Sequence, residues 1–379
     1  MVLDDDDLAH AQQAVTEFFA THETRGRYVD AFERALEVKF NRRYALFCNS
    51  GSSANLLALS ALELPKGSEV ITCACAFPTT VNPIIQCGLV PVFVDCEIGT
   101  WNIDVRQLQY ALSDKTRAVM VAHTLGNPVD LGSIYDFCLH YYLRLIQDCC
   151  DAAGAKYSKD DVSMGGNFST YSFYPAHQIT TGEGGAVLTD DPKLAKVAAS
   201  FRDWGRDCWC EPGHDNTCGK RFAGEYDHKY TYSRIGYNLK QTGWHAALGL
   251  SQLDKLDGFV KARRENWEYL KDNLIGLPLV FPIATPNSEP SWFGFAFGCE
   301  DRNGLARYLD AHKIGNRPLF AGNITRQPAY KDVTYRVVGD LHNSDYVMDH
   351  VLWIGCWPGL TKDMLDYTIE TIRSYFEKG

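Results

Sequence analysis

Small hydroxyl residues stand directly ahead of an apolar helical run near residue 50. The segment reads Asn-Ser-Gly-Ser-Ser-Ala-Asn over residues 49–55, and apolar residues 56–62 follow it. A helix that opens on such residues points backbone N–H groups and hydroxyls at one spot, and its dipole favours an anion there. The segment therefore indicates a phosphate site, although a serine-rich helix cap without a ligand explains the same residues.

Two further motifs place titratable groups near the ends of predicted strands. The first, Leu-Ile-Gln-Asp-Cys-Cys-Asp over residues 145–151, puts Asp148 and Asp151 directly after an apolar strand. An aspartate at the carboxyl end of a strand lies where cofactors bind and could hold a heteroaromatic nitrogen protonated, whereas the alternative is a helix cap. The second motif, residues 171–185, frames His177 between a proline turn and Gly-Glu-Gly-Gly.

Thirteen cysteines are the unusual feature of the composition. An odd number spread over 379 residues is not typical of a small secreted disulfide framework, so reduced thiols or metal ligands remain. Most of these cysteines are expected to be small buried packing residues. Four of them share the spacing C-x57-C-x-C-x7-C, and thiolates in such a loop suit zinc as well as iron–sulfur clusters. These four are Cys150, Cys208, Cys210 and Cys218.

The motifs need elements that bring them together, and the apolar pattern predicts a mostly parallel α/β sheet with helical crossovers. We predict a large domain over residues 1–260, with an irregular loop at 208–222, and a smaller α/β domain over residues 261–379. The predicted strands are residues 69–72, 91–95, 118–123, 143–147, 170–174 and 186–189. The predicted helices include residues 8–20, 29–40, 244–270 and 303–313.

Charge and hydropathy exclude several classes of protein. The 37 basic and 47 acidic residues give a formal net charge of -10, which disfavours nucleic acid as a partner. No apolar run approaches the length of a membrane span. Met1 to Asp7 are acidic and lack the features of a signal peptide, so we expect a cytoplasmic protein with no membrane partner.

Together the three motifs resemble the sugar aminotransferases of the DegT/DnrJ/EryC/StrS family, which are pyridoxal-phosphate enzymes of the aspartate-aminotransferase type (fold type I). The resemblance implies a mixed, mostly parallel sheet in the large domain. It implies a cofactor phosphate at the serine-rich helix start and Ser172, a pyridine nitrogen paired with Asp148, and a ring stacked on the aromatic residue after the Glu-Val-Ile-Thr strand. The implied cofactor-binding residues are Gly51, Ser52, Ser53, Phe77, Asp148, Asp151, Ser172 and Asn238.

Asn238 belongs to a Gly-Tyr-Asn motif that reaches the phosphate from the neighbouring subunit in relatives, so the resemblance also implies a homodimer with shared active sites. One residue departs from the aminotransferase pattern. His177 stands where aminotransferases carry the lysine that forms the internal Schiff base, and an imidazole cannot form a stable imine. A histidine can still move protons at neutral pH. This departure resembles the nucleotide-linked 4-keto-6-deoxyhexose 3-dehydratases, with His177 and Asp148 as the implied catalytic residues.

The spacing of Cys150, Cys208, Cys210 and Cys218 resembles the iron–sulfur branch of these dehydratases, whose motif holds a two-iron, two-sulfur (2Fe–2S) cluster. The resemblance then implies the removal of the C3 hydroxyl from a nucleotide-linked 4-keto-6-deoxyhexose, with pyridoxamine or pyridoxal 5'-phosphate as cofactor. It also implies a separate NAD(P)H-dependent flavin and iron–sulfur reductase, a ferredoxin or a flavodoxin as electron donor. The alternatives are a nucleotide-sugar aminotransferase and a glutamate-regenerated 3-dehydratase that works without a cluster.

Overall fold

The computed structural model describes residues 2–21, 26–208, 210, 216, 217, 219, 221 and 226–377. The chain divides into two compact units, and the long helix α8 (Gly243–Leu274) begins in one and ends in the other. Unit 1 contains Pro65–Val162 and Leu256–Gly379, and unit 2 contains Leu3–Leu64 and Ser163–Lys255. The predicted division of the chain at residue 260 stays a prediction. No helix in the described ranges is long and apolar enough to cross a membrane.

Unit 1 is built on five parallel strands in the order β5-β4-β2-β3-β13. In the four strands other than Arg336–Val337 the central residues are buried, as the continuous apolar runs predict for strands covered on both faces. The strands are β2 (Glu69–Cys73), β3 (Val90–Val94), β4 (Thr116–Ala122), β5 (Arg144–Asp148) and β13 (Arg336–Val337). The helices near them in sequence are α4 (Pro78–Gln86), α5 (Leu108–Ala111), α6 (Leu131–His140) and α10 (His342–His350).

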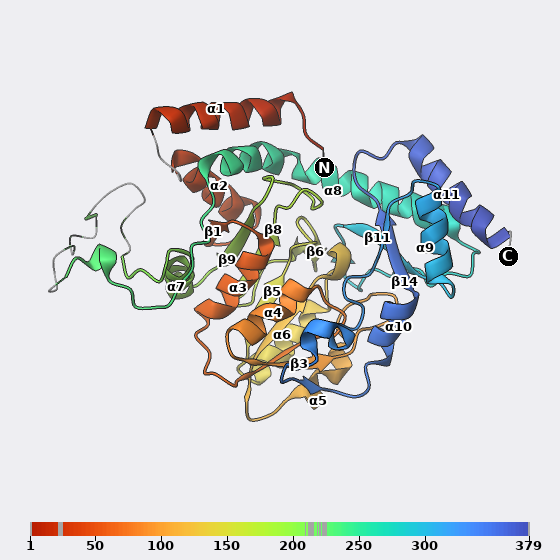
Figure 1. The fold of residues 1–379 in the computed structure, drawn as a ribbon, viewed down its shortest axis with the longest axis horizontal. Helices are drawn as coiled ribbons and strands as arrows, with labels where there is room; N and C mark the ends of the chain where they lie inside the picture. Colours follow the sequence, from red (N-terminus) through yellow and green to blue (C-terminus); the bar gives the residue numbers. More distant parts are fainter. Residues whose placement is uncertain are drawn as a thin grey trace. The chain divides into compact units, whose positions relative to one another are not determined.

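Two small antiparallel sheets complete unit 1. One consists of β11 (Gly294–Gly298), β14 (Val351–Gly355) and β12 (Asn316–Pro318), near α9 (Arg302–Ala311) and α11 (Lys362–Glu377) (Figure 1). Its core includes Trp267 and Trp292, whose rings stack with centroids 4.2 Å apart. The other consists of β10 (Ser288–Glu289), β6 (Lys156–Tyr157) and β7 (Asp160–Asp161).

Unit 2 is built on three antiparallel strands in the order β1-β9-β8. Buried aromatic residues pack between its strands and helices, with the Phe32 ring edge-on to Phe47 at 5.0 Å and to Phe173 at 5.4 Å. The strands are β1 (Tyr44–Cys48), β8 (Phe168–Ser172) and β9 (Gly185–Thr189). The helices are α1 (Asp5–Thr21), α2 (Gly26–Lys39), α3 (Gly51–Ala61) and α7 (Pro192–Arg202).

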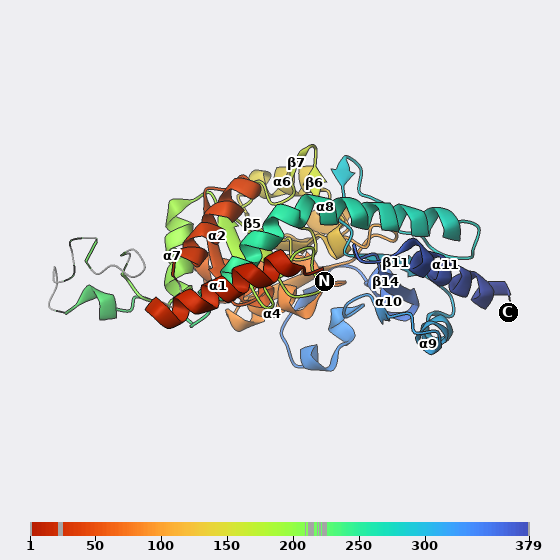
Figure 2. The ribbon, with the colours of Figure 1, turned by 90° about the horizontal axis from the view of Figure 1, so that it is seen from above.

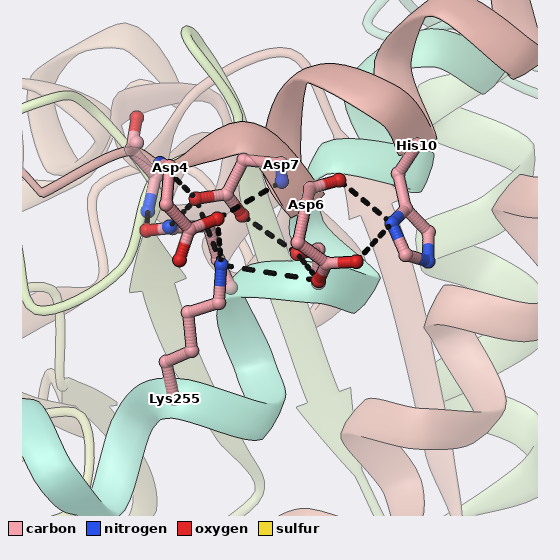
Figure 3. A network of polar contacts seen from close by, with 8 residues as sticks. Asp4, Asp6, Asp7, His10 and Lys255 are labelled. Carbon is pink, nitrogen blue, oxygen red and sulfur yellow. Dashed lines mark hydrogen bonds and ion pairs between the residues drawn. The ribbon is translucent and has the colours of Figure 1, made fainter.

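An acidic first turn fastens α1 to the first part of α8, and the two helices lie side by side (Figure 2). Asp7 is 2% exposed, forms an ion pair of 3.0 Å with Lys255, and accepts hydrogen bonds from Ser251 and Gln252. Asp4 lies 2.6 Å from the same Lys255 ammonium, which joins the turn to the helix (Figure 3). Because three partners compensate the buried carboxylate of Asp7, the contact can be stabilising despite its burial.

Candidate active site

Asp148 is the last residue of β5, and its carboxylate is buried and held on both oxygens. Thr80 Oγ1 donates to Oδ2 at 2.7 Å, and the backbone N–H of Cys150 donates to Oδ1 at 3.1 Å. Thr80 lies in the first turn of α4 and is 1% exposed. Two fixed donors give the carboxylate one orientation, which suits a residue that must face a single ligand atom.

Phe77 precedes the same helix and has half of its surface exposed. Its backbone is extended, and Pro78 begins α4 directly after it. The Phe320 ring packs edge-on against it, with centroids 5.9 Å apart. One turn of chain thus presents an accessible aromatic ring and, three residues later, the hydroxyl that orients Asp148.

Cys150 does not continue the strand that ends at Asp148. β5 ends at Asp148, and Cys150 lies in the turn that follows, with its N–H bonded to the Asp148 carboxylate. Burial, followed by the charge of Asp148 and a hydrogen bond to it, raises the pKa of the Cys150 thiol well above its usual value. The two side chains are therefore neighbours because the turn folds back onto the carboxylate.

Asp151 is the last residue of this turn, and the pKa of its carboxyl is shifted. Burial raises the pKa of its carboxyl to about 8, and the nearby charge of Asp148 adds to the effect. The backbone N–H of Leu125 donates to it and lowers the pKa in part. At neutral pH the Asp151 carboxyl is therefore largely protonated and can donate a hydrogen bond.

The serine-rich segment begins α3 as the sequence predicts, with Ser50 as the N-cap. Ser50 Oγ accepts from the backbone N–H of Ser53 at 3.1 Å and lies 3.0 Å from the Ser53 hydroxyl. Gly51 is buried, Ser52 is exposed and Ser53 is half-buried. A capped helix start and a phosphate-binding turn are compatible, since the cap uses one of the first N–H groups and the remaining ones point away from the helix end.

The His177 loop runs from the end of β8 to the start of β9 in the same unit. Its closure comes from Phe173, whose carbonyl accepts from the Thr181 N–H at 3.0 Å and from the Thr180 hydroxyl at 2.9 Å. His177 is half-buried, and its N–H donates to the Tyr174 carbonyl at 3.0 Å. These bonds fix the backbone on both sides of the imidazole.

The serine turn and the His177 loop share one edge of the unit 2 sheet. Gly185, the first residue of β9, is paired with Cys48 on one side and with Ser172 on the other. A Cβ atom on Gly185 would lie 2.3 Å from the Ser50 carbonyl oxygen, so only glycine allows the strand to approach the helix start this closely. Ser172 and the start of α3 are therefore brought together at this edge.

Gln252 links the His177 loop to the acidic turn of α1. Its side-chain oxygen accepts from the Thr180 N–H at 3.4 Å, and its Nε2 donates to Asp7 at 2.8 Å. Gln252 is 1% exposed, so both bonds lie away from solvent. The N-terminal helix thereby supports the loop that carries His177.

Asn238 lies in an extended segment that pairs with the chain after α7. Asp203 and Asn238 form an antiparallel bridge, and the Leu239 carbonyl accepts from the backbone N–H of Asn49 at 3.0 Å. The Gly-Tyr-Asn segment therefore lies against the residue that precedes the Ser50 cap. Any contact of Asn238 with a neighbouring subunit stays a prediction.

The thiols of Cys208 and Cys210 lie together with the imidazole of His228, and all three residues are half-buried. The Cys210 sulfur is 3.9 Å from His228 Nε2. The predicted fourth thiol, Cys218, lies outside the described residues. In the described part of the chain no cysteine forms a disulfide.

Each unit thus gathers part of the predicted set. Unit 1 brings Phe77, Asp148, Cys150 and Asp151 into two adjoining turns, and unit 2 joins the serine turn to the His177 loop. Sequence reasoning missed Thr80 and gave His228 no role. The only sequence signal for Thr80 is that it carries a hydroxyl in the first turn of a helix that begins directly after the aromatic residue Phe77. The charged neighbours of His228 are as typical of a solvated loop histidine as of a ligand-binding one.

The side chains present fit the expected cofactors by the chemistry of their donor groups. A capped helix start with serines suits a phosphate, and a buried oriented carboxylate suits a protonated ring nitrogen. Half-buried thiols suit a thiophilic metal centre. The roles of the single residues stay predictions.

Known proteins resemble this chain over nearly its whole length. The 3-dehydratase for dTDP-4-dehydro-2,6-dideoxy-D-glucose from Saccharopolyspora spinosa is 49% identical over 399 residues, covering 100% of this chain and 86% of the relative. The lipopolysaccharide biosynthesis protein RfbH of Salmonella typhimurium is 50% identical over 375 residues, covering 93% and 86%. Both alignments thus extend over far more of the chain than the short motifs do.

A solved structure extends the likeness to the fold. The E. coli GDP-4-keto-6-deoxy-D-mannose-3-dehydratase with bound hydrated PLP superposes with a TM-score of 0.88 at 29% identity, covering 98% of this chain and 97% of that one. The predicted α/β fold of type I, with mixed and mostly parallel strands, is thereby confirmed. A family model matches residues 5–373. The chain therefore belongs to the DegT/DnrJ/EryC1/StrS aminotransferase family.

Proposed function

We propose that this protein removes the C3 hydroxyl of a nucleotide-activated 4-keto-6-deoxyhexose with the help of pyridoxamine 5'-phosphate and a 2Fe–2S cluster. The observation that carries the proposal is His177, an imidazole in a loop whose neighbours all fit the aminotransferase pattern. The relatives from S. spinosa and E. coli bear the names of 3-dehydratases, which supports the same chemistry here.

Bound pyridoxamine phosphate would supply an amine for the C4 ketone of the sugar and a conjugated ring that accepts electrons. Gly51, Ser52, Ser53 and Ser172 would hold its phosphate at the start of α3, and Asn238 would reach that phosphate from the partner subunit. Asp148, oriented by Thr80, would keep a proton on the ring nitrogen. Phe77 would cover one face of the ring.

Two neighbouring acids would have different tasks, because Asp151 is largely protonated at neutral pH whereas Asp148 has two donors on its carboxylate. We assign Asp151 a hydrogen-bond donor role toward the cofactor ring. His177 would take a proton from the cofactor carbon C4′ and deliver one to the departing C3 hydroxyl. The backbone hydrogen bond from His177 to the Tyr174 carbonyl fixes the main chain that carries this imidazole.

The overall change is reductive. The C3–oxygen bond breaks, a C3–hydrogen bond forms, two electrons and two protons are consumed, and one water leaves. The thiolates of Cys150, Cys208, Cys210 and Cys218 would hold the cluster, which passes electrons singly. Its electrons would come from a separate NAD(P)H-dependent flavin and iron–sulfur reductase, a ferredoxin or a flavodoxin. The reduced thiols fit a reducing compartment, so we place this homodimer in the cytoplasm.

The electron source distinguishes the proposal from its two alternatives. Purified protein would be incubated anaerobically with pyridoxamine phosphate and CDP-, dTDP- or GDP-linked 4-keto-6-deoxyhexose, with either a reduced ferredoxin or glutamate. We expect a 3-deoxy-4-keto sugar with ferredoxin and no product with glutamate alone. An amino sugar would instead indicate an aminotransferase, and a deoxygenated product with glutamate alone would indicate the dehydratase without a cluster.

The position of His177 has its own test. A His177→Lys variant should bind pyridoxal phosphate covalently, so that borohydride treatment leaves the cofactor on the denatured protein. His177→Asn, which keeps a polar side chain of similar size, serves as the matched control and should show neither covalent binding nor deoxygenation. Failure of the lysine variant to retain cofactor would place residue 177 away from the reacting carbon.

A further inference from the structure

The loop after α7 carries a metal-binding arrangement that includes a histidine. Arg206 and Tyr232 form an antiparallel bridge, and the Asp207 N–H donates to the Thr231 carbonyl at 2.9 Å. Gly205 makes this pairing possible, because it has a φ of +83° and a Cβ there would lie 1.9 Å from the Arg234 carbonyl oxygen. The pairing brings Cys208 beside the 3-10 turn η3 (His228–Tyr230).

Three donor atoms converge there. The sulfurs of Cys208 and Cys210 and a ring nitrogen of His228 all lie within 4.8 Å of one another, and the Cys210 sulfur is 3.9 Å from His228 Nε2. In a tetrahedral site with metal–sulfur bonds of about 2.3 Å and metal–nitrogen bonds of about 2.0 Å, the donors stand about 3.5 to 3.8 Å apart. The donor atoms therefore need to approach one another by up to about 1.3 Å to enclose an ion.

The second ring nitrogen of His228 faces a carboxylate. His228 Nδ1 lies 4.0 Å from an oxygen of Asp227, which is beyond hydrogen-bond distance, so the carboxylate must come about 1 Å closer to orient the ring. Asp227 is itself fixed by the Arg221 guanidinium at 2.9 Å and by the Lys229 N–H at 2.9 Å. A carboxylate behind one nitrogen is the usual companion of a histidine that binds metal through the other, because it selects the tautomer and orients the ring.

We propose that Cys208, Cys210 and His228 form a three-donor site for one thiophilic divalent metal ion, and that this site binds metal without Cys150. Two sulfurs and an imidazole suit Zn²⁺ or Fe²⁺ and leave a fourth position open. The inference goes beyond the proposed function, because it concerns the loop of unit 2 alone and holds whether or not a cluster forms. Where a cluster does form, an ion in this site would compete for two of its sulfurs.

Cobalt(II) is a suitable probe because thiolate ligation gives it intense near-ultraviolet charge-transfer absorption and tetrahedral geometry gives it strong visible bands. The full-length protein would be freed of metal, kept anaerobic and titrated with Co²⁺. We expect one ion per chain with both sets of bands. Cys150→Ser should titrate as the unchanged protein does, whereas Cys208→Ser or Cys210→Ser should lose much of the charge-transfer intensity.

Substitutions of His228 test whether this histidine binds the metal ion. His228→Ala should weaken Co²⁺ binding at least tenfold, and Asp227→Asn should weaken it about tenfold, as carboxylate partners of metal-bound histidines do. His10→Ala, on α1 with a side chain 41% exposed, is the matched control and should leave the titration unchanged. His228→Cys keeps a donor and should bind Co²⁺ with added charge-transfer intensity, so that loss of binding in His228→Ala cannot be mistaken for misfolding.

Two results would overturn the proposal. Unchanged Co²⁺ affinity in His228→Ala would remove the histidine from the site, and loss of binding in Cys150→Ser would show that the loop does not bind metal by itself. Neither result depends on catalysis. A failed deoxygenation assay with an intact cobalt titration would therefore count against the proposed function alone.

Discussion

Cys150 and the pair Cys208 and Cys210 offer thiols in contrasting surroundings. Cys150 follows a buried strand, its amide is bonded to Asp148, and burial together with that carboxylate raises its pKa. Cys208 and Cys210 lie on a half-buried loop beside a histidine. The charge of Asp148 therefore opposes deprotonation of Cys150, whereas the thiols of Cys208 and Cys210 lie beside an imidazole. The cysteine motif in the sequence does not show this difference in surroundings.

Alkylation rates test the contrast most strongly. In metal-free protein at pH 8, iodoacetamide should modify Cys208 and Cys210 far faster than Cys150, because only thiolates react. Cys48, whose pKa burial raises to about 12, is the internal reference and should react on the order of a thousandfold more slowly than an ordinary thiol. Peptide mass spectrometry over time measures all four sites. If Cys150 reacted as fast as Cys208, the two thiol regions would not differ in the way described above.

Thr80 tests how much the Asp148 turn depends on its hydrogen bonds. Thr80→Val removes the hydroxyl that donates to Asp148 Oδ2 and leaves a buried charge with fewer partners. The loss of a bond to a charged group is about 1.5 to 3 kcal/mol, so we expect affinity for pyridoxamine phosphate to fall about tenfold to a hundredfold. Thr80→Ser keeps the hydroxyl and should bind nearly normally in the same fluorescence titration. Equal affinity in both variants would argue against an orienting role.

Replacing Asp151 should have a smaller effect than replacing Thr80, and this effect is a change of stability that depends on pH. The folded pKa of Asp151, about 8, lies above the ordinary aspartate value of 3.8, so its contribution to stability is present at low pH and is lost as the pH rises toward 8. Asp151→Asn removes this loss and keeps an oxygen for the Leu125 N–H. Thermal melting of cofactor-free protein should therefore show the variant gaining stability over the unchanged protein at pH 8 but not at pH 4. A constant difference across that range would contradict the raised pKa.

The sequence predicts the strands that precede the site residues, because buried parallel strands are continuous apolar runs. β5 ends at Asp148 within one residue of its predicted end. β1 is missed, since Tyr-Ala-Leu-Phe-Cys contains no β-branched residue and is only five residues long. The hydrogen bond from Thr80 to Asp148 joins positions 68 residues apart, and the pairing that brings His228 to Cys208 depends on a glycine with positive φ. Such long-range contacts produce no local periodicity in the sequence, so they cannot be predicted from it.

The contrast between the two thiol regions matters most if they hold one iron–sulfur centre. Anaerobically purified protein, reconstituted with iron and sulfide, can be examined by electron paramagnetic resonance after one-electron reduction. We predict a 2Fe–2S signal with about two irons and two sulfides per chain. In Cys150→Ser that signal should disappear while Co²⁺ binding by the loop persists. A 2Fe–2S signal that survives in Cys150→Ser, or protein that takes up zinc and no iron, would contradict the account.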